Sequence, residues 1–159
     1  MTAYEERWTD AEIAVLDGYV AGGGFLVLTN SGSRLKYLAQ RWEANEDWAA
    51  GNTIASRFGV AWLAGSLAGA SATPHGSSPL ISGVARLALA AGNGVPFAVQ
   101  SGQVLARAGS QPAVALLRPN AASGEVLVVA DLGMLMTSAD VSPVNLPFWR
   151  NLARYAHDR

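Results

Sequence analysis

The sequence contains no cysteine, which excludes disulfides, thiolate metal sites and thiol nucleophiles. Charged residues are scarce, at 14% against 50% hydrophobic residues, and this balance argues against a disordered chain and predicts a core that is large relative to the surface. Neither sign of charge dominates, because 11 basic and 12 acidic residues give a net charge of -1. No stretch gathers Lys and Arg into a stripe that would neutralise several phosphates, so we expect no nucleic-acid partner.

Long apolar runs are also missing. No run approaches the roughly 20 residues that a membrane helix needs. Residues 1–8 are polar and acidic, unlike the basic and then apolar start of a signal peptide. We therefore expect no membrane insertion by this chain, and the compartment stays open. The 159 residues fit a single domain that spans 1–159.

The clearest pattern runs over residues 22–32, where three glycines precede an apolar stretch and the polar turn Asn30-Ser31-Gly32. The glycines predict the end of a helix over 10–21, whose start is marked by the capping-box spacing of Thr9 and Glu12. The apolar residues that follow show no polar alternation, which favours a strand covered on both faces. The turn would then lie at a strand's carboxyl end, the usual place for ligands in an open α/β sheet.

Further elements follow from apolar spacing and turn residues. We expect one helix from Ser33 and another from Asn45 to Gly59, a short strand at 60–63, and a long loop over 64–78 as a candidate rim or lid. Two hairpins are predicted, pairing 95–100 with 103–107 and 112–117 with 125–130. The most apolar run, 126–130, predicts a central strand that ends at Asp131. Pro147 suits the first turn of a final helix.

This order of elements resembles the class I glutamine amidotransferase-like domains, specifically their non-catalytic bacterial branch. The resemblance rests on loose glycine and apolar patterns over nearly the whole chain: 22–32, 52–60, 83–84, 124–131 and 145–152. It implies a flavodoxin-like α/β fold, with a mostly parallel sheet, helices on both faces and an antiparallel extension.

The chain departs from that family at two places. Where catalytic members carry a cysteine nucleophile, this sequence has Asn30, or Ser31 if the register shifts by one residue. An amide is no useful nucleophile. The family also has strand-helix units before the helix expected at 10–21, and these are absent here. We expect either a piece of a longer protein or a partner chain that covers the exposed sheet edge.

The alternative enzyme hypothesis is a serine hydrolase built on Ser31, with His75 or His157 as the base and Asp131 or Asp140 as its orienting acid. The flanks of Ser31 lack the G-x-S-x-G pattern of a nucleophile elbow. A turn or helix cap is the simpler role for Asn30 and Ser31. The two histidines and scattered carboxylates show no metal-ligand spacing, so we expect no metal and no cofactor.

Asp131 is the most informative carboxylate, because burial after a central strand is costly without hydrogen bonds. It is read as a backbone cap or as a ligand contact that shares one crevice with Asn30. The candidate ligand-binding residues are Asn30, Ser31, Gly32 and Asp131. The sequence thus favours a non-catalytic binding or assembly module with a protein partner or self-association. A serine hydrolase and a binder of a small metabolite or sugar remain as alternatives.

Overall fold

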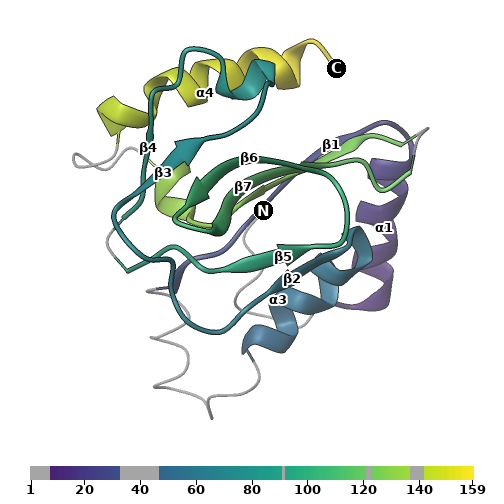
Figure 1. The fold of residues 1–159 in the computed structure, drawn as a ribbon. Helices are drawn as coiled ribbons and strands as arrows, with labels where there is room; N and C mark the ends of the chain where they lie inside the picture. Colours follow the sequence, from purple (N-terminus) through teal and green to yellow (C-terminus); the bar gives the residue numbers. More distant parts are fainter. Residues whose placement is uncertain (1–7, 33–46, 91, 121–122, 137–141) are drawn as a thin grey trace.

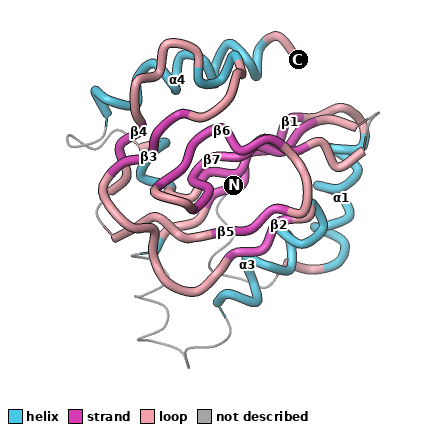
Figure 2. The backbone as a smooth tube through the Cα atoms, viewed as in Figure 1, coloured by secondary structure: helices cyan, strands magenta, loops and turns pink. Residues whose placement is uncertain are grey.

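The computed structural model describes residues 8–32, 47–90, 92–120, 123–136 and 142–159. Figure 1 shows the strands between two groups of helices, with α4 on one side and α1 and α3 on the other. Figure 2 shows how much of the chain between the strands is loop. The helices are α1 (Asp10–Ala21), α3 (Asp47–Ala55) and α4 (Ser142–His157), with 3-10 turns at Ser56–Phe58, Pro79–Ile81 and Leu132–Leu135. The strands are β1 (Phe25–Thr29), β2 (Val60–Trp62), β3 (Ser71–Pro74), β4 (Leu87–Ala88), β5 (Phe97–Val99), β6 (Gln103–Ala108), β7 (Gln111–Leu117) and β8 (Glu125–Val129).

The main sheet has six strands in the order β1-β8-β7-β6-β3-β4 and is strongly curled (Figure 1). Only β1 and β8 pair in parallel, and every other neighbouring pair in this sheet is antiparallel. The predicted flavodoxin-like fold is therefore wrong. A flavodoxin-like sheet needs repeated crossover helices between parallel strands, whereas β7 pairs in antiparallel register with both β6 and β8.

A small second sheet pairs β2 with β5 in antiparallel register, with Trp62 opposite Phe97. Their rings meet edge to face at 5.5 Å between centroids. This pairing corrects the predicted hairpin between 95–100 and 103–107, since β6 instead pairs with β7 across Gly109. Gly109 has a φ of 59°, which favours glycine at that turn. The second predicted hairpin is confirmed, with Val114 opposite Val129.

Helix α1 forms as the sequence predicts. Glu12 N donates to Thr9 Oγ1 at 3.3 Å, and Thr9 N donates to Glu12 Oε2 at 2.8 Å, which completes the capping box. The helix ends at Ala21, and Gly23 has a φ of 99°. The strand that follows buries Leu26 and Leu28.

Strand β8 lies between β1 and β7, and all five of its residues are buried. The predicted central strand is thus confirmed. β1 itself is an edge strand of the described sheet, not a central one. Close packing at the start of this pair requires Gly124, because an added Cβ there would collide with the carbonyl oxygen of Gly24.

Three other boundaries differ from the predictions. The loop expected over 64–78 contains β3, which pairs with both β4 and β6. The final helix begins at Ser142, so Pro147 lies inside α4 rather than in its first turn. The helix predicted from Asn45 to Gly59 ends earlier, at Ala55, and a 3-10 turn over Ser56–Phe58 leads to Gly59, whose φ of 73° is left-handed. The helix predicted from Ser33 falls outside the described residues.

Candidate functional site

The carboxyl ends of β1 and β8 lie side by side because the two strands run parallel, with Thr29 opposite Val129. The carbonyl oxygen of Asn30 accepts a hydrogen bond from Leu132 N at 2.8 Å. Asn30 and Asp131 therefore leave the sheet at the same end, next to one another. Both are buried, with exposed fractions of 5% and 0%.

Both carboxylate oxygens of Asp131 accept hydrogen bonds from backbone N–H groups. Gly133 N donates to Oδ1 at 2.8 Å, and Ala90 N donates to Oδ2 at 2.7 Å. Burial raises the pKa of Asp131 above its ordinary value, against the two backbone hydrogen bonds that lower it. The side chain caps the 3-10 turn that follows β8 and ties the segment around Ala90 to the strand end.

The turn after β1 is covered by the chain around residues 92–95. Gly32 N donates to Asn93 O at 2.7 Å, and a Cβ on Gly32 would lie 2.8 Å from Gly92 O. Val95 N donates to Ala130 O at 2.8 Å, so the same segment also packs on the end of β8. Ser31 is 7% exposed, and its N–H donates to Asn30 Oδ1 at 2.8 Å. The polar turn thus lies beneath backbone of its own chain.

The structure does not bring together the residues of the hydrolase hypothesis. Ser31 and Asp131 lie at the carboxyl ends of β1 and β8. His75 follows β3, which lies three strands away from β8 in the main sheet and runs antiparallel to it. His75 therefore lies at the opposite end of the sheet from Ser31 and Asp131. His75 and His157 are exposed, and His157 is the last residue of α4. Asp140 lies outside the described residues. No cluster of three or more potential metal ligands occurs in the described part of the chain.

An apolar groove of about 630 Å³ lies along α4 and β1. Among the residues that line the groove, only Thr29 and Trp149 carry a polar group in their side chains. The groove is lined by Phe25, Val27, Thr29, Leu132, Leu135, Trp149, Leu152, Ala153 and Ala156. The α4 residues recur at positions i, i+3, i+4 and i+7, which places them on one face of the helix. That spacing is readable in the sequence, but it is equally typical of a core-facing helix.

A basic stripe flanks the groove on α4. Arg150, Arg154 and His157 are exposed and each lies one residue beyond a groove residue, so they form the neighbouring face of the helix. No residue of α4 is acidic. Leu146 and Met136 are large apolar side chains close to the start of this helix in sequence, exposed to 39% and 53%. The described surface of α4 thus combines an open apolar face with positive charge.

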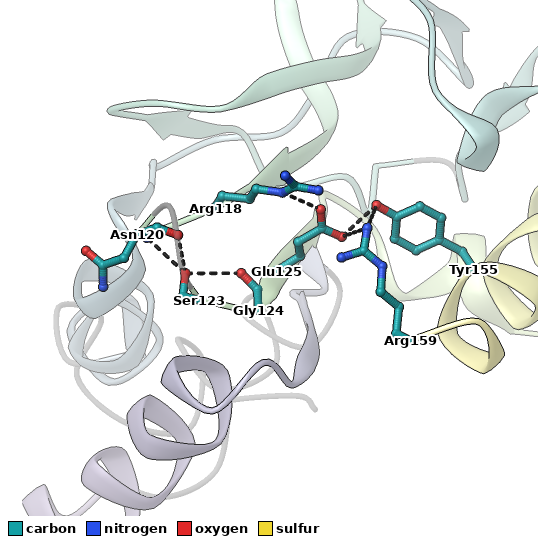
Figure 3. Close-up of polar contacts among 7 residues, drawn as sticks. All are labelled: Arg118, Asn120, Ser123, Gly124, Glu125, Tyr155 and Arg159. Carbon is teal, nitrogen blue, oxygen red and sulfur yellow. Dashed lines mark hydrogen bonds and ion pairs between the residues drawn. The ribbon is translucent and has the colours of Figure 1, made fainter.

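A second concave region contains the buried carboxylate of Glu125, which is 1% exposed (Figure 3). Arg118 Nε donates to Oε1 at 2.7 Å, Tyr155 OH donates to Oε2 at 2.6 Å, and Arg159 lies 2.7 Å from Oε2. Burial alone would raise the pKa of Glu125, but these hydrogen bonds and the two positive charges outweigh it and lower the pKa. Sequence reasoning missed this cluster. Its one signal was the position of Arg118 and Glu125 on either side of a predicted hairpin turn.

No protein-family model matches the sequence, and no curated protein matches it. Solved structures do resemble the fold. The N-terminal domain of mmIFT52 aligns with a TM-score of 0.67 and 13% identity over 98% of this chain and 75% of that one. The cytoplasmic protein STM1381 of Salmonella typhimurium LT2 aligns at 0.64 and 17% identity, over 93% of this chain and 61% of that one.

The β-galactosidase of Rahnella sp. R3 aligns with a TM-score of 0.59 and 14% identity, over 93% of this chain but only 21% of that enzyme. At these identities the similarity concerns the fold alone. The three proteins do not indicate a glutamine amidotransferase-like domain. In the described part of the chain, no helix has both the length and the apolar character needed to cross a bilayer.

Proposed function

We propose that this domain is a non-catalytic protein-binding module whose groove along α4 and β1 seats an amphipathic helix of a partner protein. The observation that carries the proposal is the groove of about 630 Å³, lined almost wholly by apolar side chains. Contiguous apolar surface of this kind marks interaction sites in soluble proteins. Within the groove wall, Ala153 and Ala156 are small and exposed, so a second helix can approach α4 closely.

A helix fits this surface better than an added strand. Strand addition at β1 needs outward-facing backbone groups at its edge. At Phe25 those groups already bond to Tyr19, whose hydroxyl lies 3.3 Å from Phe25 N and 3.4 Å from Phe25 O. A helix instead needs an apolar channel and no free backbone donors.

Charge selects the partner. Arg150 and Arg154 border the groove, so a partner helix with Asp or Glu beside its apolar face gains electrostatic attraction and a faster association rate. A second copy of this chain is disfavoured, because a two-fold symmetric contact through α4 would bring the same basic stripe from both copies together. The partner is therefore a different protein with an acidic-flanked amphipathic helix.

The geometry of the polar residues supports a module without catalysis of its own. Both oxygens of Asp131 are bonded to backbone N–H groups, and His75 lies at the other end of the sheet from Ser31. The Rahnella β-galactosidase carries a region of the same fold in about a fifth of its length. A fold that forms a small part of a larger protein is compatible with an assembly role.

The proposal is tested with two synthetic helical peptides of about 18 residues, or five turns. Both carry the same apolar stripe, one flanked by Glu and the other by Lys. We expect fluorescence anisotropy to show at least about tenfold tighter binding of the Glu-flanked peptide, a difference of about 1.4 kcal/mol. The variant Ala153→Glu should lose this binding, and the matched variant Ala14→Glu, on the exposed face of α1, should keep it.

Light scattering of the protein alone completes the test, with a monomer expected. Equal binding of both peptides, or binding unchanged in Ala153→Glu, would overturn the proposal. A dimer that Ala153→Glu converts to a monomer would show that a second copy occupies the groove instead.

A further inference from the structure

The cleft beside Glu125 is a second concave site, separate from the apolar groove, with a volume of about 370 Å³. Pockets of this size hold small molecules. Its lining mixes polar side chains with the apolar residues Pro79 and Leu116, whereas the groove is almost wholly apolar. Hydroxyl and amide groups come from Ser77, Ser78, Ser101 and Gln103, and the charged groups are Arg118 and Glu125.

The charge of Glu125 is already balanced inside the cluster. Arg159 lies 2.7 Å from Oε2, Tyr155 donates to the same oxygen, and Arg118 donates to Oε1. Arg159 also stacks on the Tyr155 ring, with its guanidinium carbon 4.5 Å from the ring centroid. Two arginines therefore meet one carboxylate, and the cluster keeps a net positive charge at the cleft.

Arg118 is the side chain that presents this charge. A guanidinium carries five N–H donors in a fixed fork, and the hydrogen bond to Glu125 uses the donor on Nε. Glu125 thereby fixes the orientation of a group that is 60% exposed in its side chain. The terminal amino groups, Nη1 and Nη2, are the donors that match a phosphate or carboxylate in a two-point contact.

The remaining donors come from the turns opposite. Gln103 Nε2 donates to Ser77 O at 2.9 Å and so holds the loop after β3 against the start of β6. Ser78 Oγ accepts from Leu80 N at 3.3 Å, which leaves its O–H as a donor. Ser101 and Gly102 form a tight turn, and the φ of Gly102 is 118°. The cleft thus combines one oriented guanidinium with hydroxyl donors on facing loops.

We propose that this cleft binds a small molecule through a phosphate group, with Arg118 as the main anion contact and Glu125 as its positioning residue. A phosphate accepts several hydrogen bonds at once, and therefore uses both the guanidinium and the serine hydroxyls. A carboxylate offers fewer acceptor sites. No residue that lines this cleft also lines the helix-binding groove along α4 and β1, although the Tyr155 ring lies 5.5 Å from the ring of the groove residue Phe25.

The test is a titration of ¹⁵N-labelled protein with inorganic phosphate, glycerol 3-phosphate and acetate at constant ionic strength, followed by NMR. We expect saturable shifts of the Arg118 side-chain signal and of the Ser101 and Gly102 amides with both phosphates. Glycerol 3-phosphate should bind more tightly than inorganic phosphate, and acetate should bind more weakly than either.

Arg118→Gln should weaken glycerol 3-phosphate binding at least about tenfold. Arg86→Gln, at an exposed arginine that lines neither the cleft nor the groove, serves as the matched control and should leave binding unchanged. Circular dichroism and the dispersion of the NMR spectrum confirm that each variant is folded. Ser101→Ala leaves the Glu125 cluster intact and should weaken glycerol 3-phosphate binding by less than Arg118→Gln does.

Linear shifts spread over all arginines would show nonspecific charge screening and overturn the proposal. Tighter binding of acetate than of phosphate would assign the cleft to carboxylates and overturn the choice of phosphate. Ala153→Glu should leave phosphate binding unchanged, so failure of the groove proposal and failure of this one are told apart.

Discussion

The side chain of Asn145 pairs with the backbone of Ala88 as a neighbouring strand would. Asn145 Oδ1 accepts from Ala88 N at 2.7 Å, and Asn145 Nδ2 donates to Ala88 O at 3.0 Å. Ala88 lies in β4, the last strand of the main sheet, and its partner strand β3 lies on the other side. A single amide thus satisfies the outward-facing groups of this short edge strand, and it does so from α4.

Two other edges are closed in the same manner. Asn52 Oδ1 accepts from Trp62 N at 2.7 Å, and Asn52 Nδ2 donates to Trp62 O at 3.1 Å, on the outer side of β2. Tyr19 bonds to both N and O of Phe25 on β1. Open strand edges invite pairing with other chains. At these three positions, side chains from α1, α3 and α4 occupy the groups that such pairing would use.

Asn145→Ala tests the edge cap of β4. The side chain is fully buried, and its loss leaves Ala88 N and Ala88 O without these partners. We expect the free energy of unfolding to fall by about 2 to 3 kcal/mol, the cost of unsatisfied polar groups. Urea denaturation measures it. Asn120→Ala, at an exposed position, should change stability by less than about 0.5 kcal/mol. Equal losses of stability in Asn145→Ala and Asn120→Ala would contradict the role of Asn145 as an edge cap.

The three caps should differ in strength. Asn52→Ala removes two short hydrogen bonds and should cost about 1 to 2 kcal/mol. Tyr19→Phe removes contacts of 3.3 and 3.4 Å at an exposed edge, and should cost no more than about 0.5 kcal/mol. Thermal and urea unfolding of both variants measure the two losses in the free energy of unfolding and so rank the caps. The reverse order would show that distance is a poor guide to these caps.

Gly124→Ala tests the close approach between the start of β8 and the glycines after α1. Gly124 N donates to Val20 O at 2.7 Å, and an added Cβ would collide with Gly24. Relief requires the two backbones to separate, so we expect a loss of about 3 kcal/mol or more in unfolding free energy.

Gly18→Ala is the matched control, because no atom lies within 4 Å of an added Cβ there. It should stabilise α1 by about 0.5 to 1 kcal/mol, since alanine is a better helix former than glycine. A similar loss in both variants would mean that the glycines act through flexibility rather than through packing.

The sequence predicted elements that depend on local chemistry and missed those that depend on pairing. Helix α1 carries its own capping box, and β8 is so apolar that burial was evident, so both were found. The order of the strands could not be predicted from the sequence. Residues 103–107 are equally compatible with a hairpin to 95–100 and with a hairpin to 111–117. Only the structure shows that β5 leaves for a second sheet while β6 pairs with β7.

The polar residues show the same difference between roles that local sequence indicates and roles that depend on distant partners. Asp131 was singled out because a carboxylate after a buried strand needs hydrogen bonds, and it has them. The role of Asn145 depends on Ala88, which is 57 residues away in the chain, and nothing local marks that pair. The Glu125 cluster likewise combines Glu125 with Tyr155 near the end of α4 and with Arg159, which follows that helix.

Asp131→Asn tests the cap at the end of β8. The carboxylate receives two backbone N–H donors, one on each oxygen. An amide has a single oxygen, so its NH₂ group must face Ala90 N or Gly133 N, donor against donor. We expect a loss of about 1 to 3 kcal/mol in unfolding free energy despite the near-identical shape. Unchanged urea denaturation would show that the two hydrogen bonds contribute little.

Glu125→Gln tests the buried ion cluster through its pH dependence. The pKa of Glu125 in the folded protein lies below that of an ordinary carboxyl, because the hydrogen bonds from Tyr155 and Arg118 and the positive charge of Arg159 outweigh the effect of burial. The folded protein therefore binds a proton at Glu125 less readily than the unfolded chain does. The stabilisation is complete above the unfolded pKa of about 4.3 and is lost as the pH falls toward the lower folded value.

Glutamine does not titrate, so the difference between wild type and Glu125→Gln should itself depend on pH. At neutral pH we expect wild type to be more stable by about 2 kcal/mol, since glutamine keeps one acceptor oxygen but loses the charged hydrogen bonds. Urea denaturation from pH 7 to pH 3 should show this gap narrowing below about pH 4. Asp158→Asn, an exposed carboxylate near the same end of the chain, should show no such gap at neutral pH. A difference for Glu125→Gln that stays constant over the whole range would mean that shape, rather than charge, holds Arg118 and Arg159 at Glu125.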